Sequence, residues 1–285
     1  GKPMTFNQSC YGLDADNDKL LDDFLYYVWQ YRFNQIQSVS HGTVFDTITM
    51  DSFKDIDIPL PSLETQKRIC NVLTSIDNKI ETNNRVNDIL EEISRSVFNY
   101  LFVDFEPYDQ FKNSEIGNVP SSFDINTLEE VLSFQRGHSY SGDEMIDEDS
   151  NKDIKQGYPM INLGNIEPGG GYRTENIKYC ENIPNDRYLV EPGDLVISHT
   201  DMTQDQDILG SPVMVPDLDN RPILFSHHLY SIKDCDLPEE FLYYYFLSPY
   251  FKPKAESFAS GTTVLSFSSK IASDVKIPIP PEEDV

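Results

Sequence analysis

The chain has 285 residues, of which 39% are hydrophobic and 12% aromatic, enough for one or two domains with packed cores and too many for a disordered chain. No apolar run approaches the roughly 18 residues that cross a bilayer, and no secretory pattern opens the chain, so we predict no contact with a membrane. The 22 basic and 48 acidic residues give a net charge of −26, which argues against nucleic-acid binding through a broadly basic surface.

The acidic residues are spread along the chain instead of forming a tail. This pattern is typical of a halophile-like protein, because at molar salt the Debye length is roughly 3 Å and acidic groups repel little; an acidic surface for protein partners is the alternative. The four cysteines, Cys10, Cys70, Cys180 and Cys235, form no C-x-x-C spacing. We expect free thiols and a cytoplasmic location.

The N-terminal segment is repeated near the end of the chain. "GTVFDTITMDSFKDIDIPLP" (42–61) matches "GTTVLSFSSKIASDVKIPIP" (261–280) without gaps, and "DDFLYYVWQY" (22–31) matches "EEFLYYYFLS" (239–248). A third block pairs Phe6, Tyr11 and Leu13 with Phe225, Tyr230 and Ile232. Three blocks in the same order predict a duplicated domain, and their wide spacing excludes a solenoid of short repeats.

The repeat predicts the domain boundaries. We expect the C-terminal part of a first domain at 1–61, a connector at 62–104 and a second domain at 105–281. A second copy that starts near "EIGNVPSSFD" (115–124) would place the start of the first roughly 100 residues before Gly1. We therefore expect the chain to be a fragment.

The connector is predicted to be one long helix. Ser62 follows Pro61 and can cap its start, Glu64 suits the first turn, and no Gly or Pro interrupts residues 63–106. A seam at alternating spacings of three and four follows the heptad pattern of a coiled coil. Its members are Ile69, Leu73, Ile76, Ile80, Asn83, Asn87, Leu90, Ser94, Val97 and Leu101.

Forty helical residues would form a rod of roughly 60 Å. Asn83 and Asn87 interrupt the apolar seam, either as polar residues tolerated at a wet seam or to set the register against a partner helix. A single helix with such a seam is not stable alone, so a second helix is implied.

The second domain mixes strands with helix, and we predict an α+β fold. Short strands are expected at 158–166, 172–180, 193–201 and 212–217. A helix is expected at 237–251, with Glu239 and Glu240 in its first turn.

Catalytic and metal-binding motifs are not evident. "GGGY" (169–172) lacks the lysine and helix start of a phosphate-binding loop. His227 and His228 are expected on a strand, where they would point to opposite faces and could not chelate one metal. The acids of "GDLVISHTDMTQDQ" (193–206) and Asp207 lack a nearby lysine for a nuclease site, so we predict no metal and no cofactor.

Two kinds of polar segment could approach DNA. The loop 200–206 is rich in Thr, Gln and Asp, which base-edge hydrogen bonding requires. "SGTT" (260–263) and its counterpart "HGTV" (41–44) are small, donor-rich turns expected between a helix and a strand, although glycine there could serve the turn alone. The basic residues of the second domain cluster between residues 136 and 187, as Arg136, Lys152, Lys155, Arg173, Lys178 and Arg187.

Residues 58–107, "IPLPSLETQKRICNVLTSIDNKIETNNRVNDILEEISRSVFNYLFVDFEP", resemble the first conserved region of specificity subunits of type I restriction–modification systems. The residues that carry the resemblance are Pro59, Pro61, Leu63, Gln66, Ile69, Leu73, Asp77, Ile80, Glu81, Asn84, Leu90, Phe102 and Phe105. "GDLVISHTDMTQDQDILGSPVMVP" (193–216) is similar to the core of that family's target recognition domain, and "IGNVPSSFDINTL" (116–128) to its start.

The resemblance implies duplicated α/β target recognition domains that alternate with long helices. Each domain would read half of a bipartite site in double-stranded DNA, and the helices would set the half-site spacing and dock two methyltransferase subunits, which restriction (translocase and endonuclease) subunits join. The subunit itself would not be an enzyme. Relative to the family, the front of the first domain is missing, and the second helix would only begin at 282–285.

We predict the DNA-reading surface within 136–173 and 200–206, together with the turn at 262–263. Its residues are Arg136, His138, Ser139, Tyr140, Tyr172, Arg173, Thr200, Thr203, Gln204, Thr262 and Thr263. The partner-helix seam comprises Leu73, Ile76, Ile80, Asn83, Asn87, Leu90, Val97 and Leu101.

Two other functions fit the sequence. The chain could be an acidic coiled-coil scaffold that binds only protein, or a hydrolase with an unrecognised carboxylate site. A scaffold would retain no DNA selectively at any salt concentration, whereas a hydrolase would turn over substrate by itself.

Overall fold

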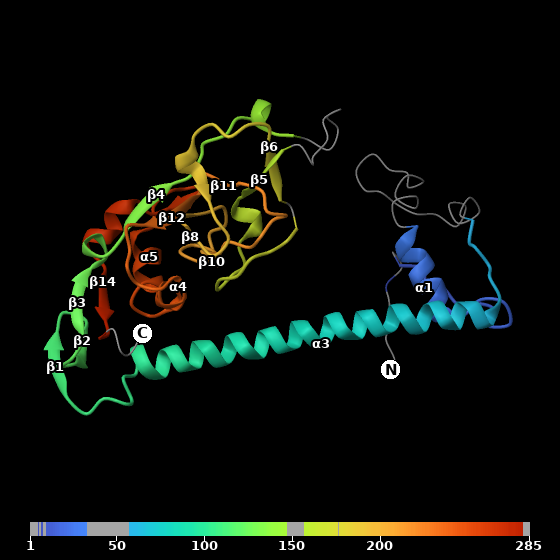
Figure 1. The fold of residues 1–285 in the computed structure, drawn as a ribbon, viewed down its shortest axis with the longest axis horizontal. Coiled ribbons are helices and arrows are strands. Elements are labelled where there is room, and N and C mark those ends of the chain that lie inside the picture. The colour runs from blue at the N-terminus through green and yellow to red at the C-terminus, as the bar shows by residue number, and fades with distance from the viewer. Residues whose placement is uncertain are drawn as a thin grey trace. The chain divides into compact units, whose positions relative to one another are not determined.

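The computed structural model describes residues 5, 7, 10–32, 57–146, 157–175 and 177–281 (Figure 1). The turn expected at 41–44, most of the repeated segment 42–61, Lys152 and Lys155, and the expected helix start at 282–285 lie outside these residues. The chain divides into two compact units, Gly1–Glu91 and Glu92–Val285.

The N-terminal unit pairs a short helix with the first part of a long one. Helix α1 (Asp22–Tyr31) buries Phe24 and Val28, which form a small cluster with Cys70 of helix α3 (Leu63–Phe102). A polar hub lies beside this cluster. The Gln66 side chain is fully buried, its Oε1 accepts from Leu21 N at 2.9 Å, and its Nε2 donates to the carbonyls of Lys19 (2.8 Å) and Pro61 (2.9 Å).

Helix α3 follows the sequence prediction to within two residues at each end. Ser62 Oγ accepts a hydrogen bond from Thr65 N at 3.3 Å, which confirms it as the cap. The helix stops at Phe102, since Phe105 adopts a left-handed φ of 55° that an α-helix cannot contain. Its 40 residues correspond to a length of roughly 60 Å.

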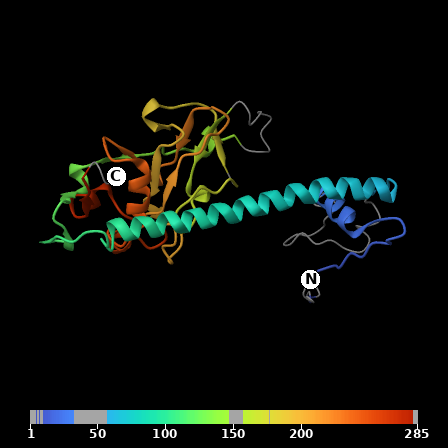
Figure 2. The ribbon, with the colours of Figure 1, turned by 60° about the horizontal axis from the view of Figure 1, so that its bottom comes forward.

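The C-terminal unit combines short sheets with two helices, α4 (Glu239–Leu247) and α5 (Lys252–Phe258) (Figures 1 and 2). One four-stranded sheet has the order β10 (Pro212–Met214), β8 (Leu195–Ser198), β12 (Leu229–Lys233), β4 (Ser133–Arg136), and the other has β6 (Lys178–Cys180), β5 (Tyr158–Ile161), β11 (Ile223–Phe225), β7 (Leu189–Val190). The two-stranded pairs are β1 (Phe111–Ser114) with β2 (Gly117–Pro120), β3 (Asp124–Thr127) with β14 (Lys276–Ile279), and β9 (Thr200–Asp201) with β13 (Leu265–Ser266).

All strand pairs but one are antiparallel, the exception being β5 with β11 among the described strands. The α+β class and the long helix are therefore confirmed. The main core lies under α4 and α5 and is rich in aromatic rings, with Tyr245, Phe246 and Phe251 fully buried. It also takes in the C-terminal end of α3 through Phe98 and Phe102.

The repeated block 22–31 and its counterpart at 239–248 are helical in both places, as α1 and α4. Their buried positions also correspond: Phe24, Leu25 and Val28 match Phe241, Leu242 and Tyr245 in the alignment of the two blocks. The same residue pattern thus buries the same face of a helix in each unit.

Several predicted elements are shorter than expected. The strand at 158–166 ends at Ile161, because the Asn162 side chain accepts from Gly164 N at 2.9 Å and starts a 3-10 turn. Of 172–180 only Lys178–Cys180 is a strand. The helix expected at 237–251 is present as α4 with Glu239 and Glu240 in its first turn, but it ends at Leu247, and a separate helix, α5, begins at Lys252.

The prediction for the histidine pair is also wrong. His227 and His228 occupy the tight turn between β11 and β12 rather than a strand. Their rings lie together, with centroids 3.9 Å apart, instead of pointing to opposite faces, because a turn does not impose the alternation of a strand.

Candidate nucleic-acid interface

The turn at His227–His228 contacts residues of two other strands and of the segment between β8 and β9. Arg136 Nε, at the end of β4, donates to the His227 carbonyl at 3.0 Å, and His199 Nε2 donates to the same oxygen at 2.8 Å. Thr200 Oγ1 and His228 Nδ1 are hydrogen-bonded at 2.9 Å. The turn therefore links the predicted residues Arg136 and Thr200, which lie far apart in sequence.

The imidazoles of this group are uncharged at neutral pH. Burial lowers the pKa of His199 to about 4 and that of His228 to about 4, and it also lowers the pKa of His227. The nearby Arg136 adds to each of these shifts. The group thus offers neutral hydrogen-bonding rings beside one arginine.

The segment after β4 carries the next predicted residues. Gly137 lies so close to the Ser226 backbone that a Cβ would come within 2.3 Å of its carbonyl oxygen, so only glycine fits there. His138 is buried and bonds Glu144 through Nε2 at 2.6 Å, which lowers the pKa of that carboxyl. Ser139 is exposed and Tyr140 is half-buried, with its ring edge-on to that of His227 at 5.8 Å.

Lys178 extends this group. Its ammonium donates to Tyr140 Oη at 2.9 Å and lies 5.0 Å from the centre of the same ring. We missed Lys178, His227 and His228 as site residues. Lys178 was already among the clustered bases, while the histidine pair could have been found only by predicting the turn.

The loop between β9 and β10 holds Thr203 and Gln204, both exposed. Gln204 Nε2 donates to the Thr262 carbonyl at 3.1 Å. The strands next to these two segments in the chain, β9 and β13, pair with each other. The structure thus brings two predicted segments together, Thr203–Gln204 and Thr262–Thr263, and all four side chains are exposed. The turn at 260–263 lies between α5 and β13, as predicted.

Other predicted residues are placed differently. Thr200 is 4% exposed and supports the His228 ring, so it has little surface of its own. Tyr172 is half-buried against the core of the second sheet, and burial raises its pKa. Arg173 is exposed, and its backbone pairs with Asn165. The 172–173 segment shares no described hydrogen bond with the other predicted residues.

The residues of the predicted helix seam differ in their exposure to solvent. Ile76, Ile80, Leu90 and Val97 are each at least half exposed, Asn83 and Asn87 are exposed, and Leu73 is half-buried. Leu101 packs on the core of the C-terminal unit. Further exposed apolar residues on α3 are Val72, Val86, Ile89, Ile93 and Tyr100.

An apolar groove of about 580 Å³ lies at the C-terminal end of the helix seam, within the C-terminal unit. Its lining includes Ile93, Val97 and Leu101 of α3, together with Pro238, which precedes α4, and Tyr244 within α4. Exposed apolar grooves are typical of surfaces that bind a partner, and the apolar face of a helix is one such partner.

Within the described residues, no three His, Cys, Asp or Glu side chains are arranged to hold a metal ion. None of the described helices is long and apolar enough to cross a membrane.

Comparison with known proteins gives consistent matches. The family model described as type I restriction modification DNA specificity domain matches residues 1–92 and 120–284. The chain is 27% identical over 293 residues to the type I restriction enzyme MjaVIII specificity subunit of Methanocaldococcus jannaschii, covering 100% of this chain and 65% of that protein. It is 40% identical over 75 residues to the HindI specificity subunit of Haemophilus influenzae, covering 26% of this chain and 16% of that one.

A solved S subunit of a type I restriction–modification system from M. genitalium is similar at a TM-score of 0.48 and 17% identity, covering 91% of this chain and 62% of that chain. The chain spans less than two thirds of the length of each of these relatives.

Proposed function

Because the chain belongs to the family of type I restriction–modification DNA specificity domains, we propose that it selects a DNA sequence for such a complex and performs no catalysis itself. The observation that carries the proposal for this chain is the meeting of Thr203–Gln204 with Thr262–Thr263 on one exposed surface. Hydroxyl and amide groups are the groups that read base edges in the major groove.

Two cations of the C-terminal unit suit contact with a duplex in an otherwise acidic chain. Arg136 is exposed beside the histidine turn, and Lys178 lies on Tyr140. These cations can contact phosphate, while the neutral imidazoles avoid both repulsion and non-specific attraction. With so few bases, discrimination would depend on base contacts more than on phosphate contacts.

The finer proposal concerns the target and the partners. We propose that the C-terminal unit reads one half of a bipartite site and that α3 acts as spacer between two reading domains. Its roughly 60 Å would span nearly two turns of B-DNA at about 34 Å each. The exposed seam and the groove at Ile93 and Val97 would take a second helix and the methyltransferase subunits, which restriction subunits then join.

The test is selection from a pool of random duplexes by the purified chain at several salt concentrations. We expect an enriched sequence motif, and we expect Gln204→Ala to relax the preference at one or two base pairs by roughly tenfold, which is within the effect of one base contact. Thr174→Ala, at an exposed residue next to Arg173, serves as the control.

Three outcomes would contradict the proposal. An acidic scaffold for proteins would enrich no motif at any salt concentration. A hydrolase would cleave duplexes without other subunits. An unchanged motif in Gln204→Ala would remove the loop from the reading surface.

A further inference from the structure

The reading loop is held at its base by a buried carboxylate. Asp201 is 1% exposed, and its Oδ1 accepts from Thr203 N at 2.7 Å and from Thr203 Oγ1 at 2.8 Å. Its Oδ2 accepts from Ile208 N at 3.0 Å. One carboxylate therefore ties the entrance of the loop 202–207 to its exit.

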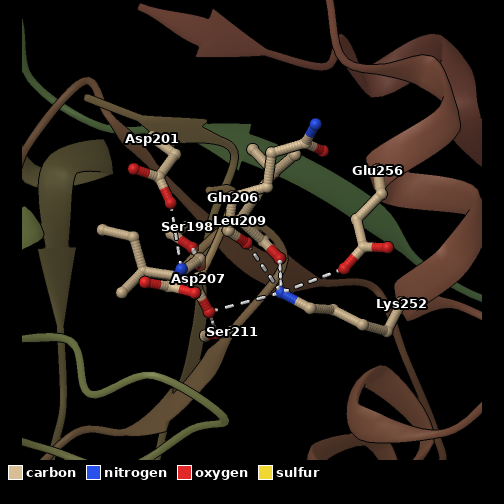
Figure 3. Close-up of polar contacts among 9 residues, drawn as sticks. Ser198, Asp201, Gln206, Asp207, Leu209, Ser211, Lys252 and Glu256 are labelled. Atoms are coloured by element: carbon tan, nitrogen blue, oxygen red, sulfur yellow. Dashed lines mark hydrogen bonds and ion pairs between the residues drawn. The ribbon is translucent and has the colours of Figure 1, made fainter. Parts of the chain in front are cut away.

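A lysine holds the same loop from the opposite side. Lys252 Nζ, at the start of α5, donates to the carbonyls of Leu209 (2.6 Å), Gln206 (3.2 Å) and Asp207 (3.4 Å) (Figure 3). Its three donors thus meet three loop carbonyls. Glu256, one turn along α5, lies 3.8 Å from the ammonium as an ion pair.

The Lys252 side chain is more buried than that of a typical surface lysine. It is 22% exposed, and burial lowers its pKa, so desolvation opposes its charge. The ammonium is close to the Glu256 carboxylate, but its hydrogen bonds of 2.6–3.4 Å go to three neutral carbonyls. What it stabilises is the path of the backbone at 206–209.

That path is strained at one residue and closely packed at another. Gln206 has a left-handed φ of 60°, which is unfavourable for a residue with a side chain. Gly210, with a φ of 74°, brings the loop exit against Ala255 and Phe251 of α5. Hydrogen bonds from Ser198 Oγ to the Ile208 carbonyl and from Ser211 Oγ to the Asp207 carbonyl complete the support.

We propose that Asp201 and Lys252 are positioning residues for sequence discrimination, because they fix the loop 202–207 so that Thr203 and Gln204 stand beside Thr262 and Thr263. This inference rests on the proposed function. Neither residue needs to touch DNA: Asp201 is buried beneath the loop, and the Lys252 ammonium is occupied by carbonyls. Their contribution is to reduce the number of conformations in which the loop meets a base pair.

The experiment compares the full chain with its Lys252→Met, Lys252→Arg and Asp201→Asn variants in selection from random duplexes. Lys254→Met, on the exposed side of α5, removes the same charge without touching the loop and is the matched control. Two further readouts are the affinity for an unrelated duplex and hydrogen exchange at the Thr203 and Ile208 amides.

We expect Lys252→Met to lose discrimination roughly tenfold at one or two base pairs, the size of one base contact. Its affinity for the unrelated duplex should equal that of Lys254→Met, and its Thr203 and Ile208 amides should exchange faster. Lys252→Arg should restore part of the discrimination, since it keeps a cation near the carbonyls. Asp201→Asn should lose discrimination too, because its amide cannot accept on both sides.

An unchanged motif in folded Lys252→Met or Asp201→Asn would overturn the inference. If Lys252→Met does not fold, Lys252→Arg and Asp201→Asn decide in the same way. If the unaltered chain enriches no motif, the proposed function fails. The amide exchange then tests by itself whether Asp201 and Lys252 hold the loop 202–207, and unchanged exchange in the variants would show that they do not.

Discussion

Helix α3 is fixed to the N-terminal unit through a buried amide and to the C-terminal unit through buried aromatic rings. In the first, Gln66 joins three backbone groups, and the adjoining apolar cluster is small, with Phe24, Val28 and Cys70 as its buried members among the described residues. In the second, Phe98 and Phe102 enter a core that also contains Phe241. The contrast shows two ways of anchoring one helix, by directed hydrogen bonds or by burial of apolar surface.

The two anchors differ in what they specify. A buried amide with three partners tolerates only one geometry, since each lost partner leaves a polar group unpaired. Aromatic packing supplies more free energy but accepts small displacements. The N-terminal anchor would therefore set the position of the helix, and the C-terminal one its stability.

The largest effect is expected from Phe102→Ala. The Phe102 ring lies 5.1 Å from both Phe98 and Phe241, and its removal should lower the free energy of unfolding of the C-terminal unit by about 3–5 kcal/mol. Chemical denaturation followed by near-ultraviolet circular dichroism measures it. Val97→Ala, which is half exposed one turn away, should cost about 0.5 kcal/mol at most.

The only tryptophan of the chain, Trp29, lies in α1 and reports on the other anchor. If Phe102→Ala shifts the Trp29 fluorescence transition as much as the circular dichroism signal, the two anchors are coupled through α3. The two anchors would then not be independent, because the helix would unfold as one body.

Gln66→Ala should have the next largest effect. It leaves Leu21 N and the carbonyls of Lys19 and Pro61 without their partner, at a cost of about 1–3 kcal/mol. The Trp29 transition should move, with little change in the C-terminal unit. Asn83→Ala, an exposed amide on the same helix, is the control; an equal shift there would show that burial of Gln66 contributes nothing.

The sequence predicted those parts of the fold that depend on local pattern. Helix α3 was found to within two residues, because Ser62, the uninterrupted run and the heptad spacing act within a few turns. Comparison of the chain with itself matched 22–31 to 239–248, and a helix was predicted for the second of these two blocks. The end of α4 at Leu247 was missed because the apolar run continues past it, although Ser248 precedes Pro249, and a residue before proline favours the extended conformation that Ser248 adopts.

The candidate site was predictable by residue type but not by arrangement. Thr203–Gln204 and Thr262–Thr263 were predicted as separate polar segments, and only the β9–β13 pairing shows that they adjoin. Sequence could not show that Thr200 is buried or that Asp201 and Lys252 hold the loop, because burial and carbonyl capping depend on contacts between distant segments.

The smallest effect on stability is expected between the two anchors, where α3 presents its exposed seam. The double variant Ile80→Gln with Leu90→Gln should change the free energy of unfolding by about 0.5 kcal/mol at most, since both side chains are more than half exposed. If the seam binds a partner helix, the same variant should weaken assembly with a methyltransferase subunit by at least about tenfold, through loss of apolar contact.

Asn78→Gln is the matched control, because it lies on the side of α3 opposite Ile80. Assembly is measured by analytical ultracentrifugation of the chain mixed with the methyltransferase subunit. Equal weakening in Asn78→Gln would show that the seam has no special role. Unchanged assembly in the double variant would mean that the middle of α3, unlike its two ends, serves only as a spacer.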